Sequence, residues 1–119
     1  MKSNLTTDVR STNSTTSIID IQGEVTGLSE NTLMDAYNQA SGEQTQNILL
    51  NFSNLEYMNS SGIGLLVTLL IRTRRQSQQL MAYGLNSHYQ QIFQLTRLNE
   101  AIQIFSSEEE ALAAAGLTK

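Results

Sequence analysis

The sequence predicts an α/β fold with a mixed, mostly parallel sheet, an N-terminal antiparallel hairpin and about four helices. Two observations support this prediction. Apolar and polar residues alternate near the N-terminus, whereas the later apolar runs are short and nearly continuous, as in strands covered on both faces. Between these runs the apolar residues recur at helical spacing, so helices and strands alternate to the end of the chain. With 119 residues, the chain is expected to form a single domain over residues 1–119.

The hairpin is predicted from the first part of the chain. Apolar residues alternate with polar ones over residues 5–9, which favours an edge strand, and the polar segment 11–14 favours a turn. The isoleucine-rich segment 17–22 follows and is expected to end at Gly23.

The middle of the chain predicts two helices around one strand. Residues 28–40 show helical spacing, with Ser29 at the start and Gly42 just after the end. The apolar run 47–52 predicts a strand, and a second helix is expected over residues 61–76. The buried stripe of this second helix is expected to be Ile63, Leu66, Val67 and Leu70. Leu65 and Leu69 project differently, and are expected either to pack under a neighbouring helix or to help meet a partner.

The C-terminal part repeats the pattern twice. A strand over residues 80–83 is expected to end at Gly84, and a third helix then runs to about Leu95 from a cap at Asn86 or Ser87. A final strand is predicted over residues 101–105. The last helix, 108–115, is predicted from a serine cap at Ser106 or Ser107, three glutamates in its first turn and Gly116 at its end.

Composition excludes several classes of function. The net charge of −4, from eleven acidic and seven basic residues, argues against a broad nucleic-acid surface and an anionic membrane partner. The chain has no cysteine, and the longest apolar run is too short to span a bilayer. We therefore expect a cytoplasmic protein without membrane insertion, whose partners are other proteins.

No arrangement of residues predicts an enzyme. The segment 62–64 lacks the lysine and the spacing of a phosphate-binding loop, and His88, the only histidine, has no partner evident in the sequence. The carboxylates are scattered through different predicted elements. We expect no catalytic residue, no metal and no cofactor.

The segment 57–64 is the most informative part of the chain. A predicted strand ends there, Ser60 and Ser61 follow, and an apolar helix begins. The first N–H groups of a helix lack intrahelical partners and carry partial positive charge, so a phosphate on either serine would be stabilised there. The alternative is that Asn59 or a serine only caps the helix. If Asn59 is the cap, Ser60 has no capping role and is the first candidate for modification.

Three segments resemble those of STAS-domain proteins, specifically the bacterial anti-sigma factor antagonists. Residues 21–25, Ile-Gln-Gly-Glu-Val, are similar to the apolar-x-Gly-Glu-apolar turn of that family. Residues 57–66 are similar to its phosphorylation segment, and residues 91–98 to the stretch before its last strand. The resemblance covers nearly the whole chain and implies a STAS-like domain.

The resemblance implies a regulatory switch. The dephosphorylated antagonist binds an anti-sigma factor that is also a serine kinase, and the sigma factor is released. Phosphorylation at Ser60, or as second choice Ser61, ends the interaction, and a serine phosphatase restores it. The expected partner-binding residues are Gly23, Glu24, Val25, Thr26, Asn59, Ser60, Ser61, Gly62, Ile63 and Thr68. A large residue in place of Gly62 or Thr68 is expected to weaken binding and leave the fold intact.

Two positions depart from the family pattern. Asn59 replaces a common aspartate, and Thr26 stands where an acidic residue is frequent. Either change could alter the kinase or the rate of phosphorylation. A STAS scaffold, or a subunit associated with a transporter and never phosphorylated, is therefore the alternative.

Overall fold

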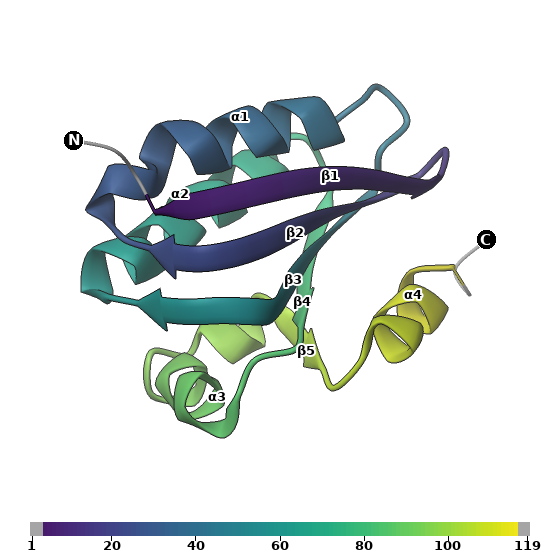
Figure 1. Ribbon diagram of the computed structural model, residues 1–119. Helices are drawn as coiled ribbons and strands as arrows, with labels where there is room; N and C mark the ends of the chain where they lie inside the picture. Colours follow the sequence, from purple (N-terminus) through teal and green to yellow (C-terminus); the bar gives the residue numbers. More distant parts are fainter. Residues whose placement is uncertain (1–3, 117–119) are drawn as a thin grey trace.

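The computed structural model describes residues 4–116, which form a five-stranded sheet in the order β1-β2-β3-β4-β5 with helices on both faces (Figure 1). The strands are β1 (Leu5–Asn13), β2 (Thr16–Val25), β3 (Asn47–Met58), β4 (Gln79–Tyr83) and β5 (Gln103–Phe105). The helices are α1 (Glu30–Ala40), α2 (Ser60–Arg75), α3 (Ser87–Leu95) and α4 (Glu108–Gly116), with 3-10 turns η1 (Gly27–Ser29) and η2 (Leu98–Glu100). Only the β1–β2 pairing is antiparallel. The predicted mixed sheet, hairpin and helices are confirmed.

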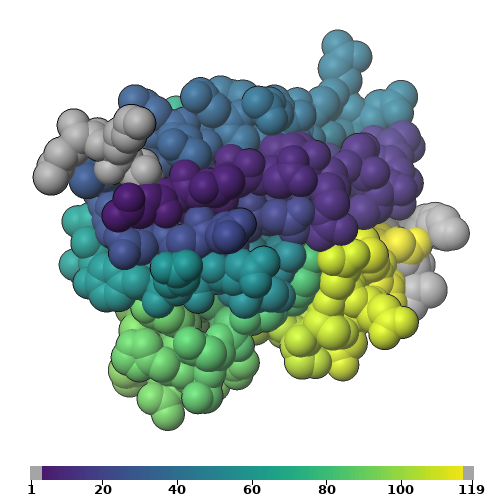
Figure 2. All heavy atoms as spheres, viewed as in Figure 1, coloured from purple at the N-terminus to yellow at the C-terminus, as the bar shows by residue number. Residues whose placement is uncertain are grey.

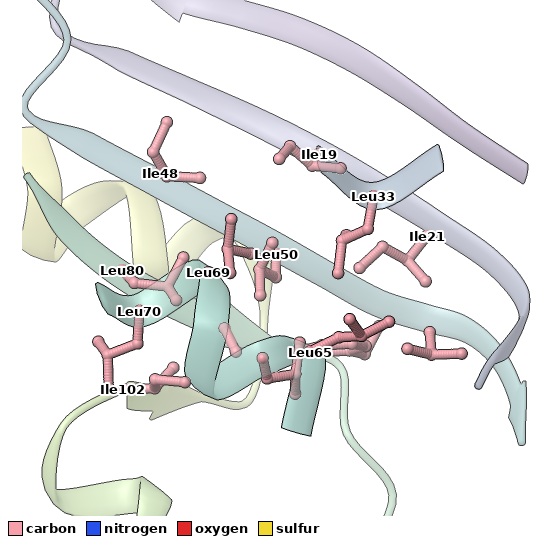
Figure 3. Close-up of a cluster of buried hydrophobic side chains, with 14 of the residues drawn as sticks. Ile19, Ile21, Leu33, Ile48, Leu50, Leu65, Leu69, Leu70, Leu80 and Ile102 are labelled. Atoms are coloured by element: carbon pink, nitrogen blue, oxygen red, sulfur yellow. The ribbon is translucent and has the colours of Figure 1, made fainter. Parts of the chain in front are cut away.

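The two faces of the sheet carry separate apolar clusters. Successive strand residues point to opposite faces, so Ile19 and Leu50 pack in the larger cluster under α1 and α2, while Ile18 and Leu49 pack in a smaller one under α4. Figure 3 shows the larger cluster, where side chains of α1 and α2 meet those of β2, β3 and β4. Seen as spheres, the C-terminal helix lies against the N-terminal strands (Figure 2).

The predicted buried stripe of α2 is wrong in part. Leu66 and Leu70 are buried as expected, but Val67 is 40% exposed and Ile63 is only partly buried. Leu65 and Leu69 are buried instead. They fall on the same side of the helix as Leu66, whereas Val67 is turned to solvent. Leu65 and Leu69 therefore belong to the larger apolar cluster, so they are not free to meet a partner.

Strands β2 and β3 run further than the sequence indicated. Gly23 does not end β2, because its left-handed backbone (φ +101°) is accommodated next to a register shift and the chain continues to Val25. The extra residues of β2 pair with β3 up to Val25 opposite Met58. The parallel strands β2 and β3 therefore end side by side, and the segments after them meet at one edge of the sheet.

The C-terminal elements agree with the prediction except at their ends. Asn86 caps α3, accepting the Tyr89 N–H at 3.0 Å, and Ser107 accepts the Glu110 N–H at 3.2 Å at the start of α4. Strand β5 begins at Gln103, later than predicted, because the N–H groups of Ala101 and Ile102 donate to the Leu98 carbonyl of the preceding turn (3.0 and 2.7 Å).

Candidate functional site

The site is built on the turn between β3 and α2. Asn59 is the N-cap of α2: its side-chain oxygen accepts the Gly62 N–H at 2.9 Å, and its own N–H donates to the Val25 carbonyl at 3.3 Å. Met58 and Ile63, before and after the cap, both pack against the larger apolar cluster, in the arrangement of a hydrophobic staple. Asn59 is therefore the residue that caps α2, and Ser60 is the first residue of the helix.

Both serines of the segment are exposed, and neither hydroxyl has a hydrogen-bond partner among residues 4–116. Their surroundings differ. A Cβ placed on Gly27 would lie 3.4 Å from Ser61 Cβ and 3.7 Å from Ser61 Oγ, so the η1 turn flanks Ser61. Ser60 begins the helix in the field of its unpaired N–H groups.

The turn after β2 is held beside these serines by local hydrogen bonds. Thr26 Oγ1 accepts the Leu28 N–H at 3.2 Å, and the Thr26 N–H donates to Ser29 Oγ at 2.9 Å. Thr26 is therefore the cap of η1, a role that an acidic residue could also fill. Glu24 is half-buried and accepts from the Asn4 side chain at 3.3 Å.

Three of the expected partner-binding residues are buried and act by shaping the site. Val25 is fully buried. A side chain on Gly23 would meet the carbonyl oxygen of Asn4, just before β1, and one on Gly62 would meet the Val25 carbonyl oxygen and come within 2.8 Å of its carbon. The expectation that a large residue at Gly62 leaves the fold intact is therefore wrong, because α2 lies directly on the backbone of β2. Thr68 is only partly buried and bonds the Gly64 carbonyl at 3.2 Å.

Tyr89 is a positioning residue that the sequence did not reveal. It is buried, and its hydroxyl accepts the Met58 N–H at 2.9 Å. Helix α3 thereby fixes the end of β3 just before Asn59. No local pattern gives this contact, since it joins residues 31 positions apart.

Exposed apolar side chains lie on the same side of α2 as Ser60. Five large apolar residues are strongly exposed within residues 4–116: Leu28, Tyr57, Val67, Ile71 and Leu95. Val67 and Ile71 lie on the solvent side of α2, Leu28 belongs to η1 beside Ser61, and Tyr57 precedes the site by three residues. We define the α2 face as Ser60, Ser61, Gly64, Val67, Thr68 and Ile71. The sequence does not predict the apolar part of this face, because helical spacing alone places Val67 in the core.

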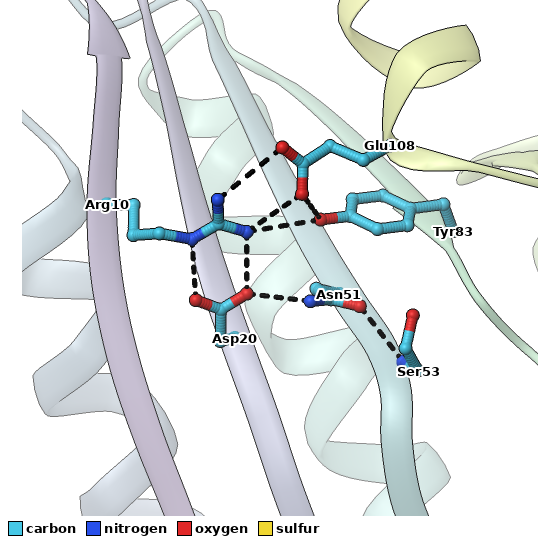
Figure 4. Close-up of polar contacts among 6 residues, drawn as sticks. All are labelled: Arg10, Asp20, Asn51, Ser53, Tyr83 and Glu108. Atoms are coloured by element: carbon cyan, nitrogen blue, oxygen red, sulfur yellow. Dashed lines mark hydrogen bonds and ion pairs between the residues drawn. The ribbon is translucent and has the colours of Figure 1, made fainter.

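A second polar cluster, separate from the candidate site, lies on the face of the sheet that α4 covers (Figure 4). Arg10 of β1 binds both carboxylate oxygens of Asp20 (2.7 and 2.8 Å) and also Glu108 of α4 (2.9 Å). Hydrogen bonding to Arg10 lowers the pKa of Asp20 and of Glu108, and burial raises the pKa of Tyr83, whose hydroxyl donates to Glu108 at 2.6 Å. Each member has a partner, so the cluster anchors α4 to the sheet.

The rest of the described chain offers neither a metal site nor a membrane span. Residues 4–116 contain no group of three or more His, Asp or Glu side chains placed to hold a metal ion. His88 is exposed and stacks edge-on with Tyr89 (4.9 Å between ring centroids). Among these residues, none of the helices is both long and apolar enough to cross a membrane.

Comparison with solved structures supports the fold. An anti-sigma factor antagonist from Mycobacterium paratuberculosis is similar with a TM-score of 0.79 and 16% identity, over 96% of this chain and 97% of that one. The unphosphorylated anti-sigma factor antagonist SpoIIAA is similar with a TM-score of 0.69 and 18% identity, over 92% and 97%. A sulfate transporter family protein from Wolinella succinogenes gives a TM-score of 0.75 and 17% identity, over 86% and 85%.

The family follows from the sequence as well as from the fold. The profile of the STAS domain matches residues 7–111, a range that includes the hairpin, the turn after β2, the Asn59–Ser60 turn and the start of α4. The chain therefore belongs to the STAS domain family.

Proposed function

We propose that this protein is an anti-sigma factor antagonist. In its unphosphorylated form it binds an anti-sigma factor through the α2 face and the η1 turn, and a sigma factor is released. Phosphorylation of Ser60 by the anti-sigma factor, acting as a serine kinase, ends the interaction, and a serine phosphatase reverses it.

One observation carries the proposal. Ser60 is exposed at the first position of α2, has no hydrogen-bond partner among the described residues, and shares one side of the helix with the exposed Val67 and Ile71, while its neighbour Ser61 is flanked by η1. A protein partner that covers Val67, Ile71 and Leu28 gains about 25 cal/mol per Å² of apolar surface removed from water. The same contact brings Ser60 into the interface.

The chemistry requires only a hydroxyl from this chain. Ser60 Oγ attacks the γ-phosphorus of ATP, the bond from that phosphorus to the bridging oxygen breaks, and ADP leaves. The hydroxyl proton passes to a base supplied by the kinase. The product carries nearly two negative charges in place of a neutral hydroxyl.

Charge explains why the modification would break the complex. A phosphate at Ser60 is stabilised in the free protein by the N-terminus of α2. In a close interface it must lose water, and an uncompensated charge there costs on the order of several kcal/mol. A loss of only about 1.4 kcal/mol already weakens binding tenfold.

Asn59, in place of the aspartate common in the family, still holds the start of α2 in the geometry that this proposal needs. Its side-chain oxygen caps α2 as an aspartate would, so the residue keeps the geometry and removes one negative charge. That charge is the difference through which a kinase could distinguish this chain from related antagonists.

A scaffold or transporter-associated role is the second candidate. It is favoured by the similarity to a sulfate transporter family protein and by the absence of the common aspartate at Asn59. In that case the α2 face would bind a partner without any modification of Ser60.

The two candidates are separated by a phosphorylation and binding experiment. The protein is mixed with candidate anti-sigma kinases and ATP, and any phosphate is mapped by mass spectrometry. Ser60→Ala is expected to bind and to stay unmodified, whereas Ser60→Asp is expected to bind at least tenfold more weakly. Ser61→Ala is expected to be the milder change.

Ser87→Asp is the matched control. Ser87 is exposed and begins α3 directly after the cap Asn86, so the substitution adds the same charge at the same helical position, away from the α2 face. It is expected to bind like the wild type. Equal affinity of Ser60→Asp and the wild type, with no phosphate on either serine of the segment, would favour the scaffold.

A further inference from the structure

Strand β3 extends beyond its neighbour β4 on the way to Ser60. The pairing of β3 with β4 ends at Asn51 opposite Tyr83, and Gly84, with a left-handed backbone (φ +84°), then turns the chain away. Strand β3 continues to Met58, and we call residues 52–58 the β3 extension. Among the strands of residues 4–116, only β2 pairs with this extension, which leads directly to Asn59 and Ser60.

The Tyr89 hydroxyl binds the open side of the β3 extension. Successive N–H groups of a strand point to opposite edges. The Asn59 N–H points to β2, where the Val25 carbonyl accepts it at 3.3 Å. The Met58 N–H points to the other side and donates to Tyr89 Oη at 2.9 Å. Met58 and Tyr89 are both buried, so this N–H needs a protein acceptor, and the hydroxyl supplies it.

Helix α3, which carries Tyr89, rests on the same extension. The buried residues of this helix are Tyr89 and Phe93, which lie one turn apart. The Phe93 ring is fully buried and contacts Phe52 of the extension edge-on, with 6.5 Å between the ring centroids. Helix α3 therefore packs on the start of the extension through a ring and binds its end through a hydroxyl.

The turn between β3 and α2 is thus fixed from two sides. Strand β2 binds the N–H of Asn59, and α3 binds the N–H of Met58. Ser60 follows directly, and its own hydroxyl has no hydrogen-bond partner among the described residues. The place of this hydroxyl therefore depends on the backbone that leads to it, and so on both contacts.

We propose that Tyr89 is a positioning residue for the phosphorylation of Ser60. This inference rests on the proposed function and assigns to α3 a part in the reaction. Phosphoryl transfer requires the attacking oxygen to lie in line with the γ-phosphorus, and a misplacement of about 1 Å can cost about 100-fold in rate. Tyr89 does not touch ATP. It limits the movement of Ser60 by binding the end of β3.

Tyr89→Phe removes the hydroxyl and keeps the buried ring. Each variant is incubated with ATP and a purified candidate anti-sigma kinase, and kcat and KM are measured with the variant as the substrate. The kcat is expected to fall about tenfold, because the Ser60 hydroxyl is less often in line for transfer. The KM is expected to stay within about twofold, since the exposed side chains of the α2 face are unchanged.

Tyr37→Phe is the matched control. Tyr37 is as deeply buried as Tyr89 (4% and 6% exposed), and its hydroxyl donates to Gln78 Oε1 at 2.8 Å. Gln78 lies beyond the C-terminal end of α2, about 24 Å from Ser60 along the helix axis. Both variants lose a buried hydrogen bond, so a merely structural role would lower kcat equally in the two. Tyr37→Phe is expected to be phosphorylated like the wild type.

Amide hydrogen exchange, followed by NMR, gives a second readout that needs no kinase. The Asn59 N–H keeps its Val25 acceptor in every variant, so its exchange reports movement of the turn and not the loss of its own bond. Its exchange is expected to be about tenfold faster in Tyr89→Phe than in Tyr37→Phe. Equal exchange at Asn59 in the two variants would overturn the positioning role.

The kinetic outcomes separate this inference from the proposed function. If Tyr89→Phe keeps the kcat of Tyr37→Phe while the wild type is phosphorylated at Ser60, the positioning role is refuted and the switch stands. A wild type that no candidate kinase phosphorylates would overturn both. Circular dichroism verifies folding. Phe93→Leu is the second variant, since it keeps the hydroxyl but loosens the helix that carries it, and it is expected to lower kcat in the same direction.

Discussion

Two glycines of α2 allow a test of how closely this helix packs against β2. Gly62 is buried, and a Cβ added there would meet the Val25 carbonyl oxygen, with the Val25 carbon at 2.8 Å and Met58 Cγ at 3.0 Å. Gly64 is exposed, and an added Cβ would meet nothing within 4 Å. The same substitution, Gly→Ala, should therefore have opposite effects two residues apart.

The magnitudes follow from the contacts. At Gly64 the change gains helix propensity and reduces the entropy of the unfolded chain, and is expected to stabilise the protein by about 0.5–1 kcal/mol. At Gly62 the same gain is present, but the nearest obstacle is backbone of β2, which cannot rotate away. Overpacking of this kind costs about 1–3 kcal/mol, so Gly62→Ala is expected to be destabilising.

Urea unfolding followed by circular dichroism measures both variants. Because the gain is common to both, the two free energies of unfolding should differ by the overpacking cost alone, roughly 1–3 kcal/mol in favour of Gly64→Ala. If Gly62→Ala proved as stable as Gly64→Ala, the close contact between α2 and β2 would be refuted.

Three further predictions concern the cap, the switch and the second polar cluster. Asn59→Ala should destabilise the protein by about 1 kcal/mol and Asn59→Asp should not, in the same unfolding assay; equal losses would contradict a capping role. A phosphate on Ser60 should leave the melting temperature within a few degrees of the unmodified protein, because it lies at a helix N-terminus; a large drop would contradict its exposure. The pKa values of Asp20 and Glu108 are lowered in the folded state. Their ionised carboxylates therefore stabilise the folded protein fully above the unfolded pKa of about 4, and this stabilisation is lost as the pH falls through the lower folded pKa values. Between pH 5 and 3, Glu108→Gln should thus lose less stability than the wild type, by roughly 0.5–1 kcal/mol after allowing for solvent screening; parallel curves would show that the pair contributes nothing.

The order of elements was predictable because each strand and helix has a local signal. Caps such as Asn59 and Asn86 and the glycine stop at Gly84 gave the positions of helix starts and strand ends. The ends of β2 and β3 were not predictable, since each extends only because the other pairs with it up to Val25 and Met58. Pairing between distant segments leaves no trace in local spacing.

The candidate site was predictable as a segment but not as a surface. Ser60 could be nominated from the cap and the helix start. The apolar surroundings could not, because Val67 follows Leu66 in an apolar run and spacing alone did not reveal which of them faces solvent. Likewise, the roles of Gly62 against Val25 and of Tyr89 against Met58 depend on contacts between different elements.

In the proposed function, a phosphate on Ser60 controls binding to an anti-sigma factor. Isothermal titration calorimetry can compare the binding of one anti-sigma factor to two preparations of this protein, unmodified and fully phosphorylated at Ser60 as verified by intact-mass spectrometry. Phosphorylation is expected to raise Kd at least tenfold, equivalent to about 1.4 kcal/mol or more. Equal Kd values for the two preparations would contradict it.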